Sequence, residues 1–220
     1  MTSASDLRVG GYSGLLFVAL SCVIVFAAPF WPPLGAAEAE VARWYVAHRT
    51  PFLVGNFLAV AAVVPSLAQL AVLVSMLRRT DDDGWLWIAV LSAGLIAHAM
   101  GAGVLTVYQA VPFIADSPAS ARALSDLAGA GFALFLLPLG GFLTFACWAI
   151  HRSAVLPRWL AYVGAPLALV IFVGSAGAIV NEGAVAGGGV VTAWSVTAFF
   201  GWCFLLSIVL IRQSMQSKVR

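Results

Sequence analysis

Charged side chains are scarce in this sequence. Asp, Glu, Lys and Arg together make up 9% of its 220 residues, whereas a soluble domain carries about 25%. Hydrophobic residues make up 62%, which is more apolar surface than a soluble fold of this length can bury. We therefore expect the chain to fold in lipid. Its net charge of +2 also argues against a nucleic-acid partner, which requires a strongly basic surface.

The sequence also lacks clustered metal ligands. Its three cysteines, Cys22, Cys147 and Cys203, lie in apolar runs without a Cys-x-x-Cys neighbour, and an odd number cannot pair completely within one chain. They are typical of small buried hydrophobic residues. The three histidines lie far apart and do not provide facing haem ligands at membrane depth. We expect no metal site and no cofactor.

Long apolar runs make up most of the chain. A spanning helix needs about 20 mostly apolar residues, and each run ends at a charge or at a Pro/Gly cluster. The sequence therefore predicts an all-α fold. It would be a polytopic membrane helix bundle with six transmembrane helices plus a short amphipathic surface helix, in one domain over residues 1–220. The predicted spans are 11–31, 52–77, 84–113, 127–150, 159–180 and 188–211.

The first run has an alternative interpretation as a cleaved signal peptide, because Arg8 precedes it. However, the run is long for such a signal. It ends in Pro29, Phe30 and Trp31 followed by two more prolines, not at a small-x-small cleavage site. The pattern favours a retained helix.

The distribution of Lys and Arg predicts the orientation, because these residues concentrate in cytoplasmic loops. If the N-terminus is inside, eight of them fall on the cytoplasmic side and three outside, and an even number of spans returns the C-terminus to the cytoplasm. We expect a multi-pass protein of the cell inner membrane, surrounded by membrane lipids. The inner set is Arg8, Arg78, Arg79, Arg152, Arg158, Arg212, Lys218 and Arg220, and the outer set is Arg43, Arg49 and Arg122.

Two outer segments differ from the spans. In residues 36–49, Val41, Trp44, Tyr45 and His48 recur at helical spacing, which predicts a short amphipathic helix on the outer leaflet. It would be either a strut leading into the second span or a lid over an outward-facing cavity. In residues 117–127, the Ser-Pro start suits a helix cap, so we expect the fourth helix to begin outside the hydrocarbon.

A single histidine, His98, lies near the middle of the third predicted span, in the stretch GLIAHAMGAG. A charged imidazole is costly there, so we expect a neutral ring that needs hydrogen-bond partners. Gln109 lies on the same helical face, and small residues such as Gly94 and Gly101 let another helix approach closely. Two interpretations stay open: an interhelical hydrogen bond that fixes packing, and a ligand or proton contact inside a cavity.

Polar residues gather towards the outer ends of several predicted spans. This predicts a pocket that opens outward, although helix ends are in general more polar than helix middles. The candidate ligand-binding residues are Trp44, Asn56, His98, Tyr108, Gln109, Asn181, Trp194 and Trp202.

Three stretches carry a resemblance to a known group: EVARWYVAHRTPFLVGNFL, SARALSDLAGAGFAL and LPRWLAYVG. With these stretches the chain resembles uncharacterised actinobacterial multi-pass membrane proteins of a domain-of-unknown-function family. The resemblance implies a six-helix bundle. It implies no established activity, so no catalytic residue follows from it.

Three functions are compatible with these observations. The leading hypothesis is a protein that binds a small hydrophobic or lipid-like molecule in an outward-half pocket. The second is an intramembrane acid–base enzyme, such as a cyclase or isomerase acting on an isoprenoid-like substrate. Asp126 or Glu182 would be its acid, with help from His98, and aromatic walls would add cation–π support. The third is a non-catalytic membrane partner or regulatory subunit.

Overall fold

The computed structural model describes residues 3–27, 32, 36–80, 84–180 and 190–216, and within these ranges the chain is helical without strands. Six helices are long and apolar enough to cross a membrane, which confirms the predicted all-α bundle. The elements are α1 (Ala4–Ala27), α2 (Glu38–Ala47), α3 (Arg49–Arg78), α4 (Leu86–Ala110), η1 (Val111–Phe113), α5 (Pro118–Ser153), α6 (Arg158–Ser175), η2 (Ala176–Ala178) and α7 (Val190–Gln216).

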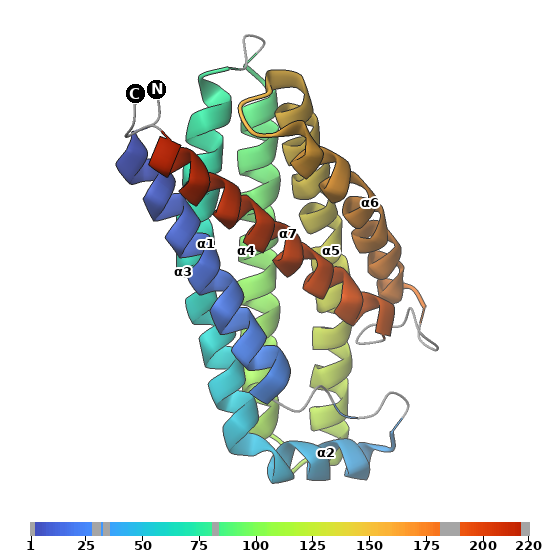
Figure 1. Cartoon of the computed structure of the whole chain (residues 1–220). Coiled ribbons are helices and arrows are strands. Elements are labelled where there is room, and N and C mark those ends of the chain that lie inside the picture. The colour runs from blue at the N-terminus through green and yellow to red at the C-terminus, as the bar shows by residue number, and fades with distance from the viewer. Residues whose placement is uncertain (1–2, 28–31, 33–35, 81–83, 181–189, 217–220) are drawn as a thin grey trace.

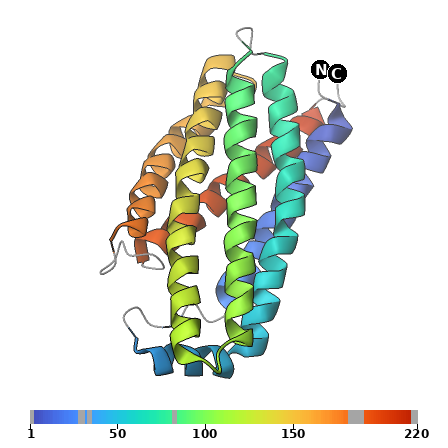
Figure 2. The same cartoon turned by 180° about the vertical axis from the view of Figure 1, so that it is seen from behind.

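The six long helices form a closed ring. In the order α1, α3, α4, α5, α6 and α7, each helix contacts the next, and α7 returns to α1. Figure 2 shows α3, α4 and α5 side by side as one layer, with α1 and α7 crossing behind them. In Figure 1, α1 and α7 lie close together where the chain begins and ends, and they diverge towards α2. The candidate site lies where α1 and α7 have separated.

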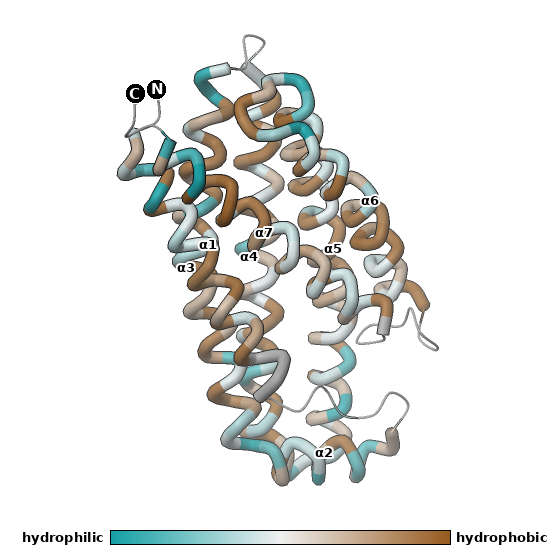
Figure 3. Tube along the Cα trace, viewed as in Figure 1, coloured by the Kyte–Doolittle hydropathy of each residue, from teal (hydrophilic) through white to brown (hydrophobic). Residues whose placement is uncertain are grey.

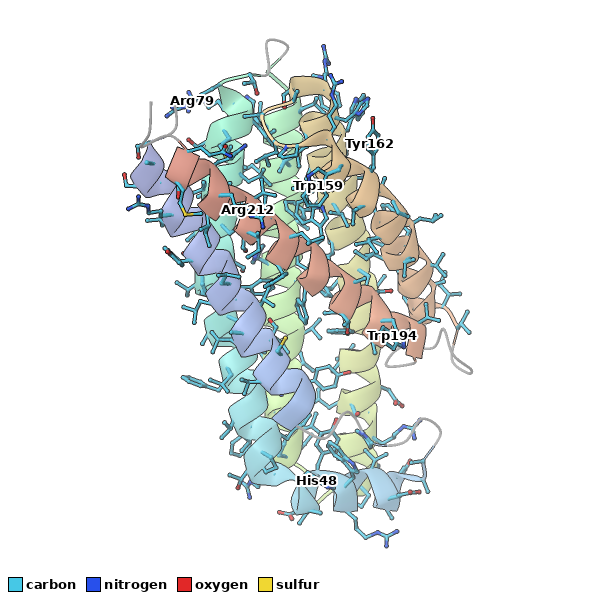
Figure 4. The ribbon with its side chains drawn as sticks, viewed as in Figure 1. His48, Arg79, Trp159, Tyr162, Trp194 and Arg212 are labelled. Atoms are coloured by element: carbon cyan, nitrogen blue, oxygen red, sulfur yellow. The ribbon has the colours of Figure 1, made fainter. Side chains whose placement is uncertain are left out.

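Both chain ends lie at one end of the bundle, and α2 lies at the other (Figure 1). Figure 4 places Arg79, Trp159, Tyr162 and Arg212 towards the end that holds the termini, and His48 at the opposite end. Hydrophilic segments concentrate at these two ends in Figure 3. This arrangement is that of a multi-pass membrane protein with an apolar middle.

The first helix begins earlier than predicted. The apolar run predicts a start at residue 11, but α1 begins at Ala4. Ser3 and Asp6 stabilise this start by reciprocal hydrogen bonds: each backbone N–H donates to the side chain of the other residue, at 3.1 Å in both cases. This is a capping box, a signal that hydropathy does not register. The residues of the predicted end of this span, up to Trp31, lie outside the described part of the chain.

The fourth long helix, α5, begins at Pro118 with Ser117 as its N-cap residue, as the Ser-Pro pair predicts. The Ser117 hydroxyl does not cap a backbone N–H; it donates to Ser120 Oγ at 2.9 Å. The helix has 36 residues and is therefore about 54 Å long, well beyond the ~30 Å hydrocarbon core. One of its ends must lie outside the hydrocarbon.

Two groups of buried apolar side chains fill the bundle. The larger one occupies the half that holds the termini and includes Leu73, Leu143, Ile150 and Trp202. The smaller one lies beneath α2 and includes Tyr45, Phe52, Tyr108 and Val111. We call them the inner cluster and the α2 cluster. A cavity separates them.

The surface helix is confirmed, with its apolar face on the protein. Val41, Ala42 and Tyr45 are buried and pack in the α2 cluster, where α2 contacts α3, α5 and η1. The Tyr45 hydroxyl lies 3.0 Å from Ser125 Oγ of α5. This face therefore covers the end of the bundle, and the position of α2 at the outer leaflet stays a prediction.

Glycines allow α1, α3 and α7 to cross closely. A Cβ atom at Gly14 would lie 2.1 Å from Gln69 Nε2 and 2.2 Å from Ser207 Oγ. Gln69 Nε2 itself donates to Ser207 Oγ at 2.9 Å and to the Cys203 carbonyl at 3.2 Å. The three helices thus meet at a buried polar contact. Any residue larger than glycine at position 14 would collide with it.

Candidate functional site

A cavity of about 230 Å³ lies inside the helix ring, between the inner cluster and the α2 cluster. Five helices line it: α1, α3, α4, α5 and α7. Most of its wall is apolar and aromatic, and among the described lining residues none carries a formally charged acidic or basic side chain. The polar lining residues are Ser21, Asn56, Ser66, His98, Tyr108 and Thr197.

Small residues on the facing sides of α3 and α4 leave this space open. Gly55 and Ala59 line the cavity from α3, and Gly101 and Ala102 line it from α4. A Cβ atom at Gly101 would meet only the Phe135 ring, at an ordinary 3.4 Å. Gly101 and its small neighbours on α3 and α4 therefore leave a hollow. The sequence predicts that small residues such as Gly101 let another helix approach closely, and this is wrong at Gly101.

Two turns earlier on α4, at Gly94, the helices do pack closely. A Cβ atom at Gly94 would lie 2.8 Å from Leu70 Cδ2 and 3.3 Å from Phe142 Cδ2. The predicted close approach is therefore confirmed at Gly94, on the side of the inner cluster. The cavity ends where this packing begins.

His98 lies at that boundary. Its Nδ1 is 2.7 Å from the Gly94 carbonyl oxygen, and its Nε2 is 2.7 Å from Ser66 Oγ of α3. A carbonyl oxygen can only accept, so Nδ1–H donates to Gly94, and Nε2 of a neutral imidazole is then an acceptor for the Ser66 hydroxyl. This hydroxyl also lies 2.8 Å from the Val63 carbonyl, so two acceptors share its one proton. The ring joins α3 to α4 and also lines the cavity. The interhelical hydrogen bond is thus confirmed, whereas the ligand or proton contact stays a prediction for a ring that lies on the cavity wall.

A serine hydroxyl on an oriented imidazole has the geometry of a nucleophile with its base. Acyl transfer also requires hydrogen-bond donors for the oxyanion. The Asn56 amide is the nearest side-chain candidate on α3, but it precedes Ser66 by ten residues, which is about 15 Å along a helix. The Ser66–His98 pair is therefore better explained as a helix–helix contact with a polar surface towards the cavity.

Asn56 lines the cavity, but its side-chain donor is closed off from the open space. Its Nδ2 is buried and has no hydrogen-bond partner among the described residues. Gln109 lies close by, because its Nε2 donates to the Leu53 carbonyl at 3.4 Å, one turn from Asn56 on α3. Its Oε1 is likewise buried without a partner in the described part of the chain, but Gln109 is not a lining residue.

Aromatic rings close the cavity towards α2. Phe52 and Tyr108 line it and lie edge to face, with their centroids 6.3 Å apart. Tyr45 and Trp44 stand behind Phe52, at 5.1 and 5.8 Å. Trp44 thus contacts the wall from outside and does not line the cavity. Burial raises the pKa of Tyr45 to about 12, and the hydrogen bond to Ser125 opposes this only in part.

Of the two acids proposed for catalysis, the structure describes Asp126 and not Glu182. Asp126 is exposed on α5, where its Oδ2 accepts from Arg122 Nε at 2.7 Å, and it is not among the lining residues. Arg122 also donates to the Ala36 carbonyl. This pair thus ties α5 to the segment before α2. Glu182, together with the candidate ligand contact Asn181, lies outside the described residues.

The two tryptophans of α7 both lie away from the cavity. Trp194 is 64% exposed, at the end of α7 that is far from the termini (Figure 4). Trp202 is fully buried in the inner cluster, and its indole N–H donates to the Leu160 carbonyl of α6 at 3.2 Å. Of the eight candidate contacts, the structure places Asn56, His98 and Tyr108 on the cavity wall.

Sequence reasoning missed Ser66 as the partner of His98. It also missed Gln69 at the α1–α3–α7 crossing, and the phenylalanines that make up much of the wall. These phenylalanines are Phe17, Phe52, Phe132, Phe135, Phe199 and Phe200. A phenylalanine in a lipid-facing helix has the same local pattern as one in a cavity wall, so no sequence signal separates them.

Comparison with protein-family models, with curated proteins and with solved structures finds no match for this chain. The resemblance to uncharacterised actinobacterial membrane proteins therefore stays a prediction, and the candidate site rests on its own geometry.

Proposed function

We propose that this protein binds a small apolar, lipid-like molecule inside the membrane, in the cavity between the inner cluster and the α2 cluster. The observation that carries the proposal is the cavity itself: about 230 Å³, lined by five helices and walled largely by apolar side chains. Ligand sites in proteins are typically concave and mostly apolar, with a few placed polar groups. The lining fits this description.

The ligand enters from the surrounding lipid in this proposal. Thr197 of α7 lines the cavity and is exposed. Thr197 belongs to the first turns of α7, and this end of the helix diverges from α1 (Figure 1). An apolar molecule dissolved in the bilayer would thus reach the cavity sideways, without crossing water.

The membrane in which the protein resides and its orientation there are also part of what we propose. We infer residence in the cell inner membrane with both termini in the cytoplasm, because basic residues concentrate in cytoplasmic loops. Arg8, Arg79, Arg152 and Arg212 all belong to helix ends on the side of the termini. The cavity then lies in the half nearer the outside.

The test is to fill the cavity. An engineered cavity of about 150 Å³ holds one benzene molecule, so the ring of Ala102→Phe would occupy more than half of this one. Ala99→Phe is the matched control, because Ala99 is exposed on the same helix and does not line the cavity. Mass spectrometry of the purified proteins measures the bound molecule.

We expect one specific small apolar species with the wild-type protein and with Ala99→Phe, and at least a tenfold loss with Ala102→Phe. Recovery of bulk phospholipids alone, in the proportions of the membrane, would contradict the proposal. A stoichiometric protein complex in mild detergent without a small molecule would favour the partner or regulatory subunit.

The cyclase or isomerase remains a separate hypothesis without an observation in its favour among the described residues. Of its two candidate acids, the structure describes Asp126, which is exposed and forms an ion pair with Arg122. The enzyme would require Asp126→Asn or Glu182→Gln to abolish turnover in a folded protein.

A further inference from the structure

Two hydroxyl groups on the cavity wall donate their hydrogens to their own helices. Ser21 Oγ donates to the Phe17 carbonyl at 2.8 Å, and Thr197 Oγ1 donates to the Ala193 carbonyl at 3.0 Å. Both side chains line the cavity. A hydroxyl oxygen whose one hydrogen is donated keeps lone pairs that can accept. To an occupant of the cavity, these two residues therefore offer acceptors.

Ser66 and His98 together hold fewer hydrogens than they have places for. The Ser66 hydroxyl lies 2.8 Å from the Val63 carbonyl oxygen and 2.7 Å from His98 Nε2. Both atoms are acceptors, because the hydrogen of the neutral ring is on Nδ1. Whichever of them takes the Ser66 hydrogen, a lone pair of Ser66 Oγ or His98 Nε2 stays open to a further donor. The Ser66–His98 bond is only part-buried, and both residues line the cavity.

The other hydrogen-bond donors on the described part of the wall are in use or covered. His98 Nδ1–H is donated to the Gly94 carbonyl. Asn56 Nδ2 is closed off from the open space, and Tyr108 is only 3% exposed. An occupant therefore meets apolar surface and lone pairs.

The lining also favours an uncharged occupant. A charged group in hydrocarbon needs an opposite charge or several hydrogen bonds, and the described lining residues include no Asp, Glu, Lys or Arg. The hydrogen that the wall can accept should therefore come from a neutral group, such as an alcohol O–H.

We propose that the cavity selects an uncharged, largely apolar molecule with a hydrogen-bond donor, and that this donor binds at the Ser66–His98 pair. The inference rests on the proposed binding function and adds the chemical class of the ligand. A molecule whose polar atoms only accept, such as an ether, would leave its oxygen unpaired. Alternatively, it would take the Ser66 hydrogen away from both Val63 and His98.

Two isomers test the inference: 1-decanol and 1-methoxynonane. Each has ten carbons and one oxygen near the end of the chain, but only the alcohol has an O–H. Binding of each radiolabelled isomer to the full chain in lipid nanodiscs is measured by equilibrium dialysis, relative to its partition into empty discs of the same lipid. We expect the alcohol to bind about fivefold more tightly than the ether or better, as one hydrogen bond left unmade implies.

The double variant Ser66→Ala, His98→Leu removes both acceptors, because either one alone could still accept from the alcohol. The preference for the alcohol should then fall to about one. Ser92→Ala is the matched control, since Ser92 is an exposed serine of α4 that does not line the cavity. It should keep the preference of the wild type.

Equal binding of the two isomers to the wild type would overturn the inference, even if the double variant failed to fold. A preference that persists in the folded double variant would overturn the assignment to Ser66 and His98.

The two proposals fail differently. If both isomers bind equally and Ala102→Phe abolishes the binding of both, the binding function survives and only the ligand class is wrong. If neither isomer binds above the blank, the inference is wrong, and mass spectrometry of the wild type and Ala102→Phe decides the binding function separately.

Discussion

At the scale of the residue, Tyr45 makes the end of the bundle sensitive to high pH. Its side chain is fully buried, and this burial raises its pKa from the ordinary value of about 10 to about 12. Below pH 10 the tyrosine is neutral in both the folded and the unfolded chain. Between pH 10 and 12 only the unfolded chain loses this proton, so the free energy of unfolding falls in that window.

The loss should amount to about 2–3 kcal/mol, since one pKa unit corresponds to about 1.4 kcal/mol. We expect Tyr45→Phe to lack it. Phenolate absorbance gives the direct measurement: the difference between the wild type and Tyr45→Phe should show a tyrosine that ionises near pH 12. Ionisation near pH 10 would contradict the buried position of this ring under α2.

The histidine shows how far the sequence leads at this scale. His98 among small apolar residues is visible as an intramembrane polar group, and its need for two hydrogen-bond partners follows from chemistry. The partner Ser66 depends on how α3 and α4 are aligned lengthwise, and no local pattern encodes this alignment. Gln109 shares a helical face with His98 but reaches the Leu53 carbonyl, because it lies three turns further along.

At the scale of the element, the crossing of α1, α3 and α7 depends on one missing methyl group. At Gly14 a Cβ atom would overlap Gln69 and Ser207. We expect Gly14→Ala to separate the helices or break the Gln69 hydrogen bonds, with a loss of about 2–4 kcal/mol.

Gly103→Ala is the control for this prediction. It also lies within a long helix, but nothing lies within 4 Å of its Cβ position, so the better helix propensity of alanine should make it neutral or slightly stabilising. Thermal unfolding in one detergent measures both variants. Equal midpoints would contradict the role of the crossing.

Hydropathy predicts the spans well because lipid requires long apolar helices with satisfied backbones. The helix ends depend on other chemistry. The Ser3–Asp6 capping box extends α1 into polar sequence, and the Ser117-Pro118 start sets the beginning of α5. The apolar face of α2 is also visible in the sequence, but the protein surface on which it packs is not.

At the scale of the whole molecule, orientation can be tested by labelling. Glu40 is exposed on α2, and Ser153 ends α5 on the side of the termini. We expect a cysteine at position 40 to react with a membrane-impermeant maleimide in intact cells, and a cysteine at position 153 to react only after the membrane is opened. Cys147 and Cys203 are buried and Cys22 is half-buried, so the unsubstituted protein gives the background. The reverse pattern would place the termini outside.

The closed ring of helices could not be predicted from the sequence. Each amphipathic pattern is weak, because a helix in lipid is apolar on every side, so the patterns do not indicate which faces meet. The cavity follows from the ring and from the small residues on α3 and α4. Because the sequence does not indicate which helix faces meet, it could not separate the three candidate contacts that line the cavity from those that do not, such as Trp202 in the packed interior.

A bundle with a void between two packed regions is softer than a solid one. Hydrostatic pressure favours whichever state occupies less volume, and a hollow of 230 Å³ corresponds to about 140 mL/mol if it is eliminated completely. The part of this volume that acyl chains from the bilayer do not fill should therefore be lost first under compression. An occupant removes that volume in advance, so the filled protein resists higher pressure.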